Sequence, residues 1–335
     1  MELPAELAAT GAAGYRIRYP STTTSNFPTT VTGFVLVPPG TPPRGGGWPV
    51  ISWAHGTTGV GDRCAPSRDP ELGGYGYPGY LAKFVRAGYA VTATDYEGLG
   101  SPGVHPYLIA ESAGRSVVDA VHAARRLAPR LSASWFAVGH SQGGHAALAA
   151  AERASHGLDF RGAVALAPVT DNRAYADGDV KPVDHAYFLA LLTGLDTQHP
   201  PLRYSDYLGP RALRELPRLH TTCLDELTDR MIGLALPGGE FTPRTPGAAG
   251  RLRDRLAGNA VPRHRSAPVL ITQGDADTLV PPEQTERAAA QARAFGTDAT
   301  LLRYPGAGHY DITETSAPDV LRWIDERLRE ARFRG

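Results

Sequence analysis

The sequence GHSQG at residues 139–143 has the form G-x-S-x-G, with a serine between two small residues. An apolar segment, Trp135–Val138, precedes it and a run of small residues follows it, which predicts a strand that turns sharply into a helix. Such a turn lifts the serine above a sheet, and it requires glycine because larger neighbours would clash. We therefore predict that Ser141 is a nucleophile and that the N–H of Gln142, at the helix start, stabilises negative charge on an oxyanion. The alternative is an ordinary turn in which the serine caps the helix.

A serine hydroxyl attacks a carbonyl efficiently only when a base removes its proton, and His309 is the candidate base. It follows a predicted strand that ends at Tyr304 and a glycine-rich loop, YPGAGH, at residues 304–309. His55, His140 and His145 also lie close to predicted turns, and we expect them to support the site rather than to act as the base.

The base needs a carboxylate that fixes its tautomer, and the segment QGDADTLVP at residues 273–281 contains two. We favour Asp277 because of its spacing in the motif. Asp275 is the alternative, and we expect its side chain to accept hydrogen bonds from N–H groups of the loop.

Apolar segments of strand length alternate with helical segments along most of the chain. We predict an opening antiparallel pair and then strands joined by helices, which is an α/β class with a mostly parallel central sheet flanked by helices. The predicted strands are Tyr15–Tyr19, Val31–Val37, Val50–Ala54, Ala90–Thr94, Trp135–Val138, Ala163–Ala167, Val269–Thr272 and Thr300–Tyr304. The predicted helices are Leu81–Ala87, Ser112–Leu127, His145–Ala154, Pro282–Phe295 and Ala317–Ala331.

The alternation fails between residues 169 and 262, where helical spacing replaces strand signals. We predict a helical cap over the carboxyl edge of the sheet, inserted between a first part of the core at residues 1–168 and a second part at 263–335. Its apolar residues favour a pocket for an acyl or aromatic group, although most of them must pack the cap itself. They are Tyr187, Phe188, Leu189, Leu191, Leu192, Leu195, Met231, Ile232, Leu234 and Leu236.

The chain order serine, aspartate, histidine, together with the alternating elements, is that of the α/β-hydrolase fold. In this fold the loop after the strand at Val50–Ala54 supplies a second N–H to the oxyanion. Here that loop is HGTTG at residues 55–59, so the fold implies Thr57 as the donor, supported by His55 and Gly56. A simple glycine-rich turn is the alternative.

The chain resembles lipases and esterases, and in particular the secretory lipase family, which includes fungal lipases like Candida lipase A and bacterial relatives. The resemblance rests on five segments. They are SWAHGTTG at residues 52–59, CAPS at 64–67, DYEGLG at 95–100, GHSQGGH at 139–145 and GDADTLVP at 274–281. It implies Ser141 as nucleophile, Asp277 as acid, His309 as base, an ester substrate and a cap that acts as a lid. Members of the family are commonly secreted.

Composition excludes several other classes of function. The 335 residues carry 34 basic and 34 acidic side chains, which argues against binding of nucleic acid or of an anionic membrane surface. No apolar stretch reaches the length of a membrane span. The cysteines, Cys64 and Cys223, form no zinc or redox motif, and they are either joined in a disulfide or two buried thiols. Residues 1–15 do not resemble a signal peptide, so we expect a secreted protein if a leader has been removed and a cytoplasmic one otherwise.

These observations predict a cofactor-free lipase or carboxylesterase that acts on a small-molecule or lipid ester. An acyltransferase or thioesterase with the same three residues is the first alternative. Peptide hydrolysis and ligand binding without catalysis are the others. Oligomeric state stays open.

Overall fold

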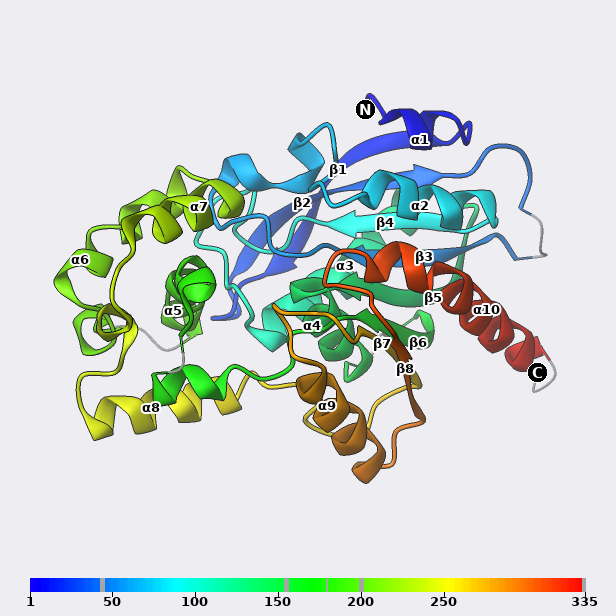
Figure 1. Ribbon diagram of the computed structural model, residues 1–335. Helices are drawn as coiled ribbons and strands as arrows, with labels where there is room; N and C mark the ends of the chain where they lie inside the picture. Colours follow the sequence, from blue (N-terminus) through cyan, green and yellow to red (C-terminus); the bar gives the residue numbers. More distant parts are fainter. Residues whose placement is uncertain (43–45, 154–156, 179, 199–201, 333–335) are drawn as a thin grey trace.

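The computed structural model describes residues 1–42, 46–153, 157–178, 180–198 and 202–332, which fold around a single eight-stranded sheet (Figure 1). The strand order is β1-β2-β4-β3-β5-β6-β7-β8. Strand β2 runs antiparallel to both of its neighbours, whereas the strands from β3 to β8 are parallel. The strands are β1 (Ala13–Thr22), β2 (Pro28–Val37), β3 (Trp48–Ala54), β4 (Ala90–Thr94), β5 (Leu131–His140), β6 (Asp159–Leu166), β7 (Val269–Gly274) and β8 (Ala299–Tyr304). The predicted fold class, including the opening antiparallel pair, is confirmed.

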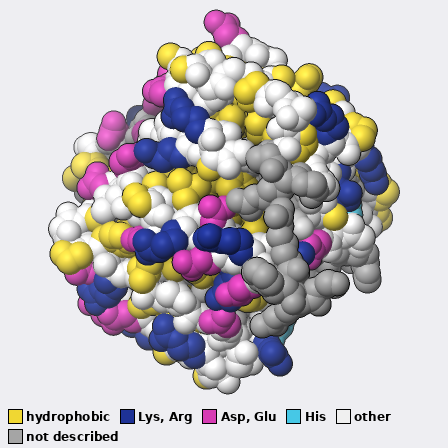
Figure 2. All heavy atoms as spheres, turned by 90° about the vertical axis from the view of Figure 1, so that its right-hand side faces the viewer, with side chains coloured by type: hydrophobic (Ala, Val, Ile, Leu, Met, Phe, Trp, Pro, Cys, Tyr) yellow, Lys and Arg dark blue, Asp and Glu magenta, His cyan; other side chains and the backbone are white. Residues whose placement is uncertain are grey.

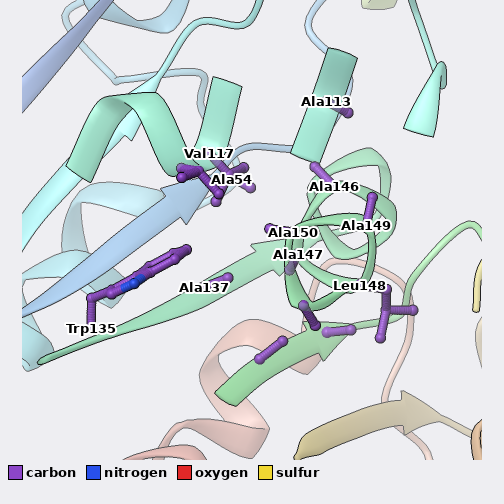
Figure 3. Close-up of a cluster of buried hydrophobic side chains, with 14 of the residues drawn as sticks. Ala54, Ala113, Val117, Trp135, Ala137, Ala146, Ala147, Leu148, Ala149 and Ala150 are labelled. Atoms are coloured by element: carbon purple, nitrogen blue, oxygen red, sulfur yellow. The ribbon is translucent and has the colours of Figure 1, made fainter. Parts of the chain in front are cut away.

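Helices cover both faces of the sheet. Helices α3 (Ala110–Leu127), α4 (Gln142–Ala151) and α9 (Pro282–Ala294) pack on one face and build the first hydrophobic core. Half of the residues of helix α4 are alanine, so it approaches both α3 and the sheet closely, as Figure 3 shows. On the other face, α2 (Tyr77–Arg86), α10 (Ile312–Arg332) and the short α1 (Ala5–Ala8) build the second core.

Residues between β6 and β7 form the helices that Figure 1 shows beyond the carboxyl ends of the parallel strands. These are α5 (His185–Gln198), α6 (Pro210–Leu213), α7 (Leu224–Leu234) and α8 (Pro246–Ala257), with short 3-10 turns between them. Their apolar side chains form a third core, to which Val60, Tyr107 and Leu108 from the sheet region contribute. We call residues 169–262 the cap. The division of the chain at its two ends stays a prediction, and residues 179 and 199–201 of this range lie outside the described residues.

Several helices begin earlier than the sequence pattern predicts. Helix α10 begins at Ile312 rather than Ala317, and Pro318 lies inside the helix. Helix α4 begins at Gln142 rather than His145, so the helix follows Ser141 directly. Helix α1 was not predicted, and Ala154, the predicted end of the helix after the G-x-S-x-G motif, lies outside the described residues.

Charged side chains of both signs share the surface. On the face in Figure 2, basic and acidic groups lie beside one another, in keeping with 34 of each in the sequence. Of the helices in the described ranges, none combines the length and the apolar character that crossing a bilayer demands.

A disulfide joins Cys64 to Cys223, which are 159 positions apart in sequence, with 5.5 Å between their Cα atoms. The sequence left the pairing open, and the structure decides it. Cys64 lies in a 3-10 turn after β3, and Cys223 directly precedes α7, so the bond ties the cap to the loops of the sheet.

We expect Cys223→Ser to lower the free energy of unfolding by about 2–5 kcal/mol, because closing a long loop removes many conformations from the unfolded chain. Urea denaturation of the wild type and the variant would measure the loss. A reductant should lower the wild-type midpoint and leave that of the variant unchanged. Equal midpoints without reductant would contradict a stabilising bond.

Candidate active site

Ser141 occupies the sharp turn between β5 and α4. Its backbone angles, φ 57° and ψ −116°, lie outside the regions that ordinary residues prefer. Its N–H donates to the Leu166 carbonyl at 2.9 Å, which holds the turn against β6. A Cβ at Gly139 would lie 2.1 Å from the Gly143 carbonyl oxygen, and a Cβ at Gly143 would lie 1.8 Å from that of Ala54. Both glycines of the motif are therefore required by close backbone contacts.

The side chains of His309 and Asp277 contact each other. The Nδ1 of His309 lies 2.7 Å from Oδ2 of Asp277, and both side chains are buried. The other oxygen of Asp277 accepts from the N–H groups of Leu279 and Val280 at 2.9 and 2.8 Å. Burial raises the pKa of Asp277, but the hydrogen bond and charge of His309 and these two N–H groups outweigh it and bring the pKa below its usual value. The carboxylate is therefore held ionised, and Nδ1 of His309 carries the proton.

Asp275 pairs with a different residue. Its carboxylate accepts a 2.6 Å hydrogen bond from Arg303 and is partly exposed. The expectation that Asp275 caps the loop was wrong, because Asp277 itself receives the loop N–H groups. One carboxylate thus holds both the loop and the histidine.

The two predicted oxyanion donors lie beside Ser141. Gln142 is the first residue of α4, so its N–H has no acceptor within the helix. Its side-chain amide nitrogen lies 3.0 Å from Nε2 of His105. Thr57 lines a small pocket together with Ser141, and its hydroxyl lies 2.9 Å from that of Tyr107. That hydroxyl is therefore engaged by a neighbour, which leaves the N–H of Thr57 as the group to consider.

The supporting residues are arranged around these donors. His55 has Nδ1 2.6 Å from the Gly56 carbonyl, its ring packs on Tyr96, and burial lowers its pKa to about 4. His140 is fully buried, with its ring centroid 4.8 Å from that of His309. Burial and, next, the neighbouring His309 lower the pKa of His140 to about 3, so His140 is neutral at ordinary pH.

Sequence reasoning missed three residues of this region: Tyr77, His105 and Tyr107. Each forms hydrogen bonds to predicted site residues that are far away in the chain. No motif contains them, and the chain has 14 tyrosines, so only the folded arrangement distinguishes Tyr77 and Tyr107 from the rest.

Two pockets meet at Ser141 and His309. The larger, of about 840 Å³ including its open mouth, lies between the cap and the sheet. Its wall combines apolar side chains, among them Leu108 and Leu191, with polar ones such as Lys181. The smaller pocket, of about 210 Å³, is walled by Tyr75, Tyr77, Tyr187 and Tyr310 in addition to the loop of Gly56 and Thr57.

Few of the apolar cap residues reach these pockets. Tyr187 and Leu191 line the larger one, whereas Phe188, Leu189 and several others pack the third core instead. Ile232 is half exposed on α7. The apolar residues of the cap therefore serve chiefly to pack the cap itself, and only some of them line the pocket.

Comparison with known proteins gives the chain its family. The family model described as secretory lipase matches residues 79–333. A Mycobacterium tuberculosis protein named as a probable inactive lipase is 27% identical over 315 residues, which is 84% of this chain and 66% of that protein. This chain thus spans slightly less than two thirds of that relative.

Solved structures share the fold. Candida antarctica lipase A in its closed state superposes with a TM-score of 0.80 at 18% identity, covering 98% of this chain and 81% of that one. The rice cell wall degrading esterase LipA from Xanthomonas oryzae gives a TM-score of 0.73 at 19% identity, covering 97% and 94%. At these identities the likeness shows the α/β-hydrolase fold, while the family model identifies the lineage: the chain belongs to the secretory lipase family.

Proposed function

We propose that this protein is a serine hydrolase that cleaves carboxylic esters through an acyl-enzyme intermediate, with no cofactor. The observation that carries the proposal is the 2.7 Å contact between His309 and Asp277 at a pocket that Ser141 also lines. An ionised carboxylate that holds a histidine in one tautomer, beside a serine on a strained turn, is the arrangement that activates a hydroxyl. Membership of a lipase family supports the ester as substrate class.

Acylation follows from these placements. Ser141 Oγ attacks the ester carbonyl while Nε2 of His309 takes the hydroxyl proton, and Asp277 stabilises the imidazolium that forms. The N–H groups of Gln142 and Thr57 donate to the oxyanion of the tetrahedral intermediate. His309 then returns the proton to the alkoxide as the C–O bond breaks, and the alcohol leaves.

Deacylation repeats these chemical steps with water as the nucleophile. His309 removes a proton from water, the hydroxide attacks the acyl carbonyl, and the proton passes to Ser141 as the acid is released. Replacement of water by an alcohol or amine would give acyl transfer with the same residues, so an added acceptor separates the two activities.

An assay of hydrolysis tests the proposal. It uses the full chain and a series of nitrophenyl esters whose acyl groups range from acetate to palmitate. We expect turnover with saturation kinetics and labelling by a fluorophosphonate, a reagent that reacts with activated serines. An optimum at long chains identifies a lipase, and one at short chains identifies an esterase. A folded protein that neither turns over an ester nor reacts with the fluorophosphonate would overturn the proposal.

The name of the Mycobacterium tuberculosis relative favours one second candidate, ligand binding without catalysis. Such a protein would retain the pocket but not an activated serine. In this chain Ser141 and His309 line one pocket and Asp277 contacts His309, which supports catalysis. Binding of an ester without labelling of Ser141 would favour the second candidate.

The disulfide supports a proposal about location. Disulfides persist in oxidising compartments and are rare in the reducing cytosol. The bond between Cys64 and Cys223, with the family's description as secretory, supports function outside the cytoplasm. Detection of the native protein in the culture medium, with its cysteines resistant to a thiol reagent, would test this.

A further inference from the structure

A chain of hydrogen bonds connects three segments at which the proposed chemistry takes place. The Gly56 N–H donates to the hydroxyl of Tyr77 at 3.1 Å. That hydroxyl lies 2.8 Å from Nδ1 of His140, and Nε2 of His140 lies 2.8 Å from the carbonyl oxygen of His309. The connected segments are the loop after β3, the last residue of β5 and the loop after β8, which are far apart in the sequence.

The chemistry of the partners fixes the direction of every bond. A carbonyl oxygen only accepts, so Nε2 of His140 carries a hydrogen and donates to His309. His140 is buried and neutral, so its Nδ1 has no hydrogen and accepts from the Tyr77 hydroxyl. The Tyr77 oxygen then accepts from Gly56. Each donor and each acceptor in the chain has its partner, and reversing any one bond would leave two groups without theirs.

We propose that Tyr77 and His140 are positioning residues for the hydrolysis. They act as a relay that holds the HGTTG loop and the backbone of His309 in fixed positions relative to Ser141. This inference rests on the proposed function. Gly56 directly precedes Thr57, the proposed oxyanion donor, and His140 directly precedes Ser141. The relay therefore sets the position of the Thr57 N–H, of Ser141 and of His309 relative to one another.

Packing around the relay leaves it little freedom. A Cβ at Gly56 would lie 2.5 Å from the Tyr77 hydroxyl, so the relay requires glycine at this position of the HGTTG loop. Tyr77 has no exposed surface, and its ring packs edge-on against Trp53 at 5.0 Å. A buried hydrogen-bonded chain of this kind rigidifies the groups that it connects.

The neutral state of His140 matters for the base. His309 becomes an imidazolium during catalysis, and a second positive charge on a ring 4.8 Å away would oppose this step. Donation from Tyr77 to Nδ1 keeps the tautomer of His140 that has no proton there. His309 is thus fixed on one side by Asp277, which accepts from its ring, and on the other by His140, which donates to its backbone carbonyl.

Tyr77→Phe tests the relay, and Tyr80→Phe provides a matched control. Both tyrosines lie buried on α2 against Trp53, but the Tyr80 hydroxyl has no hydrogen-bond partner among the residues that the structure describes. We expect Tyr77→Phe to lower kcat about 10- to 100-fold with KM unchanged within about twofold, because the loss affects the transition state more than substrate binding. Tyr80→Phe should retain wild-type kcat and KM.

A series of substitutions at His140 separates the effect of its hydrogen bonds from the effect of its packing. Glutamine supplies one acceptor and one donor on a neutral amide, whereas phenylalanine supplies only the ring. We expect activity to fall in the order wild type, His140→Gln, His140→Phe. Nitrogen-15 NMR of histidine-labelled wild type should show a neutral His140 ring with hydrogen on Nε2 from about pH 5 to pH 9, with the signal assigned by its loss in His140→Gln.

The outcomes distinguish the relay from the function on which it rests. Equal kcat in Tyr77→Phe and Tyr80→Phe, with an active wild type, would overturn the relay and leave the proposed function standing. A protonated His140, or a ring with hydrogen on Nδ1, would also overturn it, even if a His140 variant failed to fold. A wild type that hydrolyses no ester would overturn the proposed function, and the catalytic role of the relay with it.

Discussion

Ser141→Ala is expected to lower kcat for a nitrophenyl ester by about 10⁶-fold and to abolish labelling by a fluorophosphonate. Removing the nucleophile of a serine hydrolase leaves only the oxyanion donors and substrate binding to accelerate the reaction. The fold should survive, because the side chain of Ser141 receives no cap hydrogen bond from α4 and the turn is held by backbone bonds. Active-site titration of the wild type, followed by burst and steady-state kinetics of both proteins, measures the effect.

Another buried serine provides a control for the assignment of Ser141 as the nucleophile. Ser316 is a buried serine whose hydroxyl donates to the Ile312 carbonyl inside α10, distant in sequence from the turn after β5. Ser316→Ala removes a hydroxyl of equal size without touching the pocket, so it should retain kcat. Full activity in Ser141→Ala would mean that another residue carries the acyl group.

Asp277→Asn is expected to lower kcat about 10⁴-fold near neutral pH. An amide in place of the carboxylate favours the wrong tautomer of His309 and withdraws the negative charge that stabilises the imidazolium. The amide oxygen can still accept from the N–H groups of Leu279 and Val280, so the loop should keep its shape. The pH profile of kcat/KM, compared between wild type and variant, shows whether the loss lies in the base.

Asp275→Asn is the matched control for this change. Asp275 lies two residues away on the same loop, but its carboxylate pairs with the partly exposed Arg303. An exposed ion pair contributes little to stability, so this variant should keep its activity and lose at most about 1 kcal/mol of stability. If Asp275→Asn were as impaired as Asp277→Asn, the loop as a whole rather than one carboxylate would be responsible.

The fold was predictable because its signals are local. Alternating apolar strands and helices, together with the glycines around Ser141, follow from sequence neighbours alone, and the structure confirms the central sheet. The choice of Asp277 over Asp275 followed from spacing in a motif, and in the structure it is Asp277 that contacts His309.

What could not be predicted depends on contacts between distant positions. Tyr77 and His140 are 63 residues apart. Tyr77 begins a helix and His140 ends a strand, and no periodic pattern in the sequence predicts a contact between two such positions. The disulfide has the same character, since two cysteines separated by 159 positions give no sign of their distance in space. The start of α10 is hard to predict for a different reason: the helix continues through Pro318, although proline usually occurs in the first turn of a helix.

The bond between Cys64 and Cys223 also determines what becomes of the protein after proteolysis. A single cut at any peptide bond between these two residues opens the chain, yet the fragments stay covalently joined through the sulfur atoms. All of β4 and β5, Ser141 and the first part of the cap lie within this stretch. A nicked molecule would therefore remain one molecule of two chains, with Ser141, Asp277 and His309 still connected, until a reductant separates it.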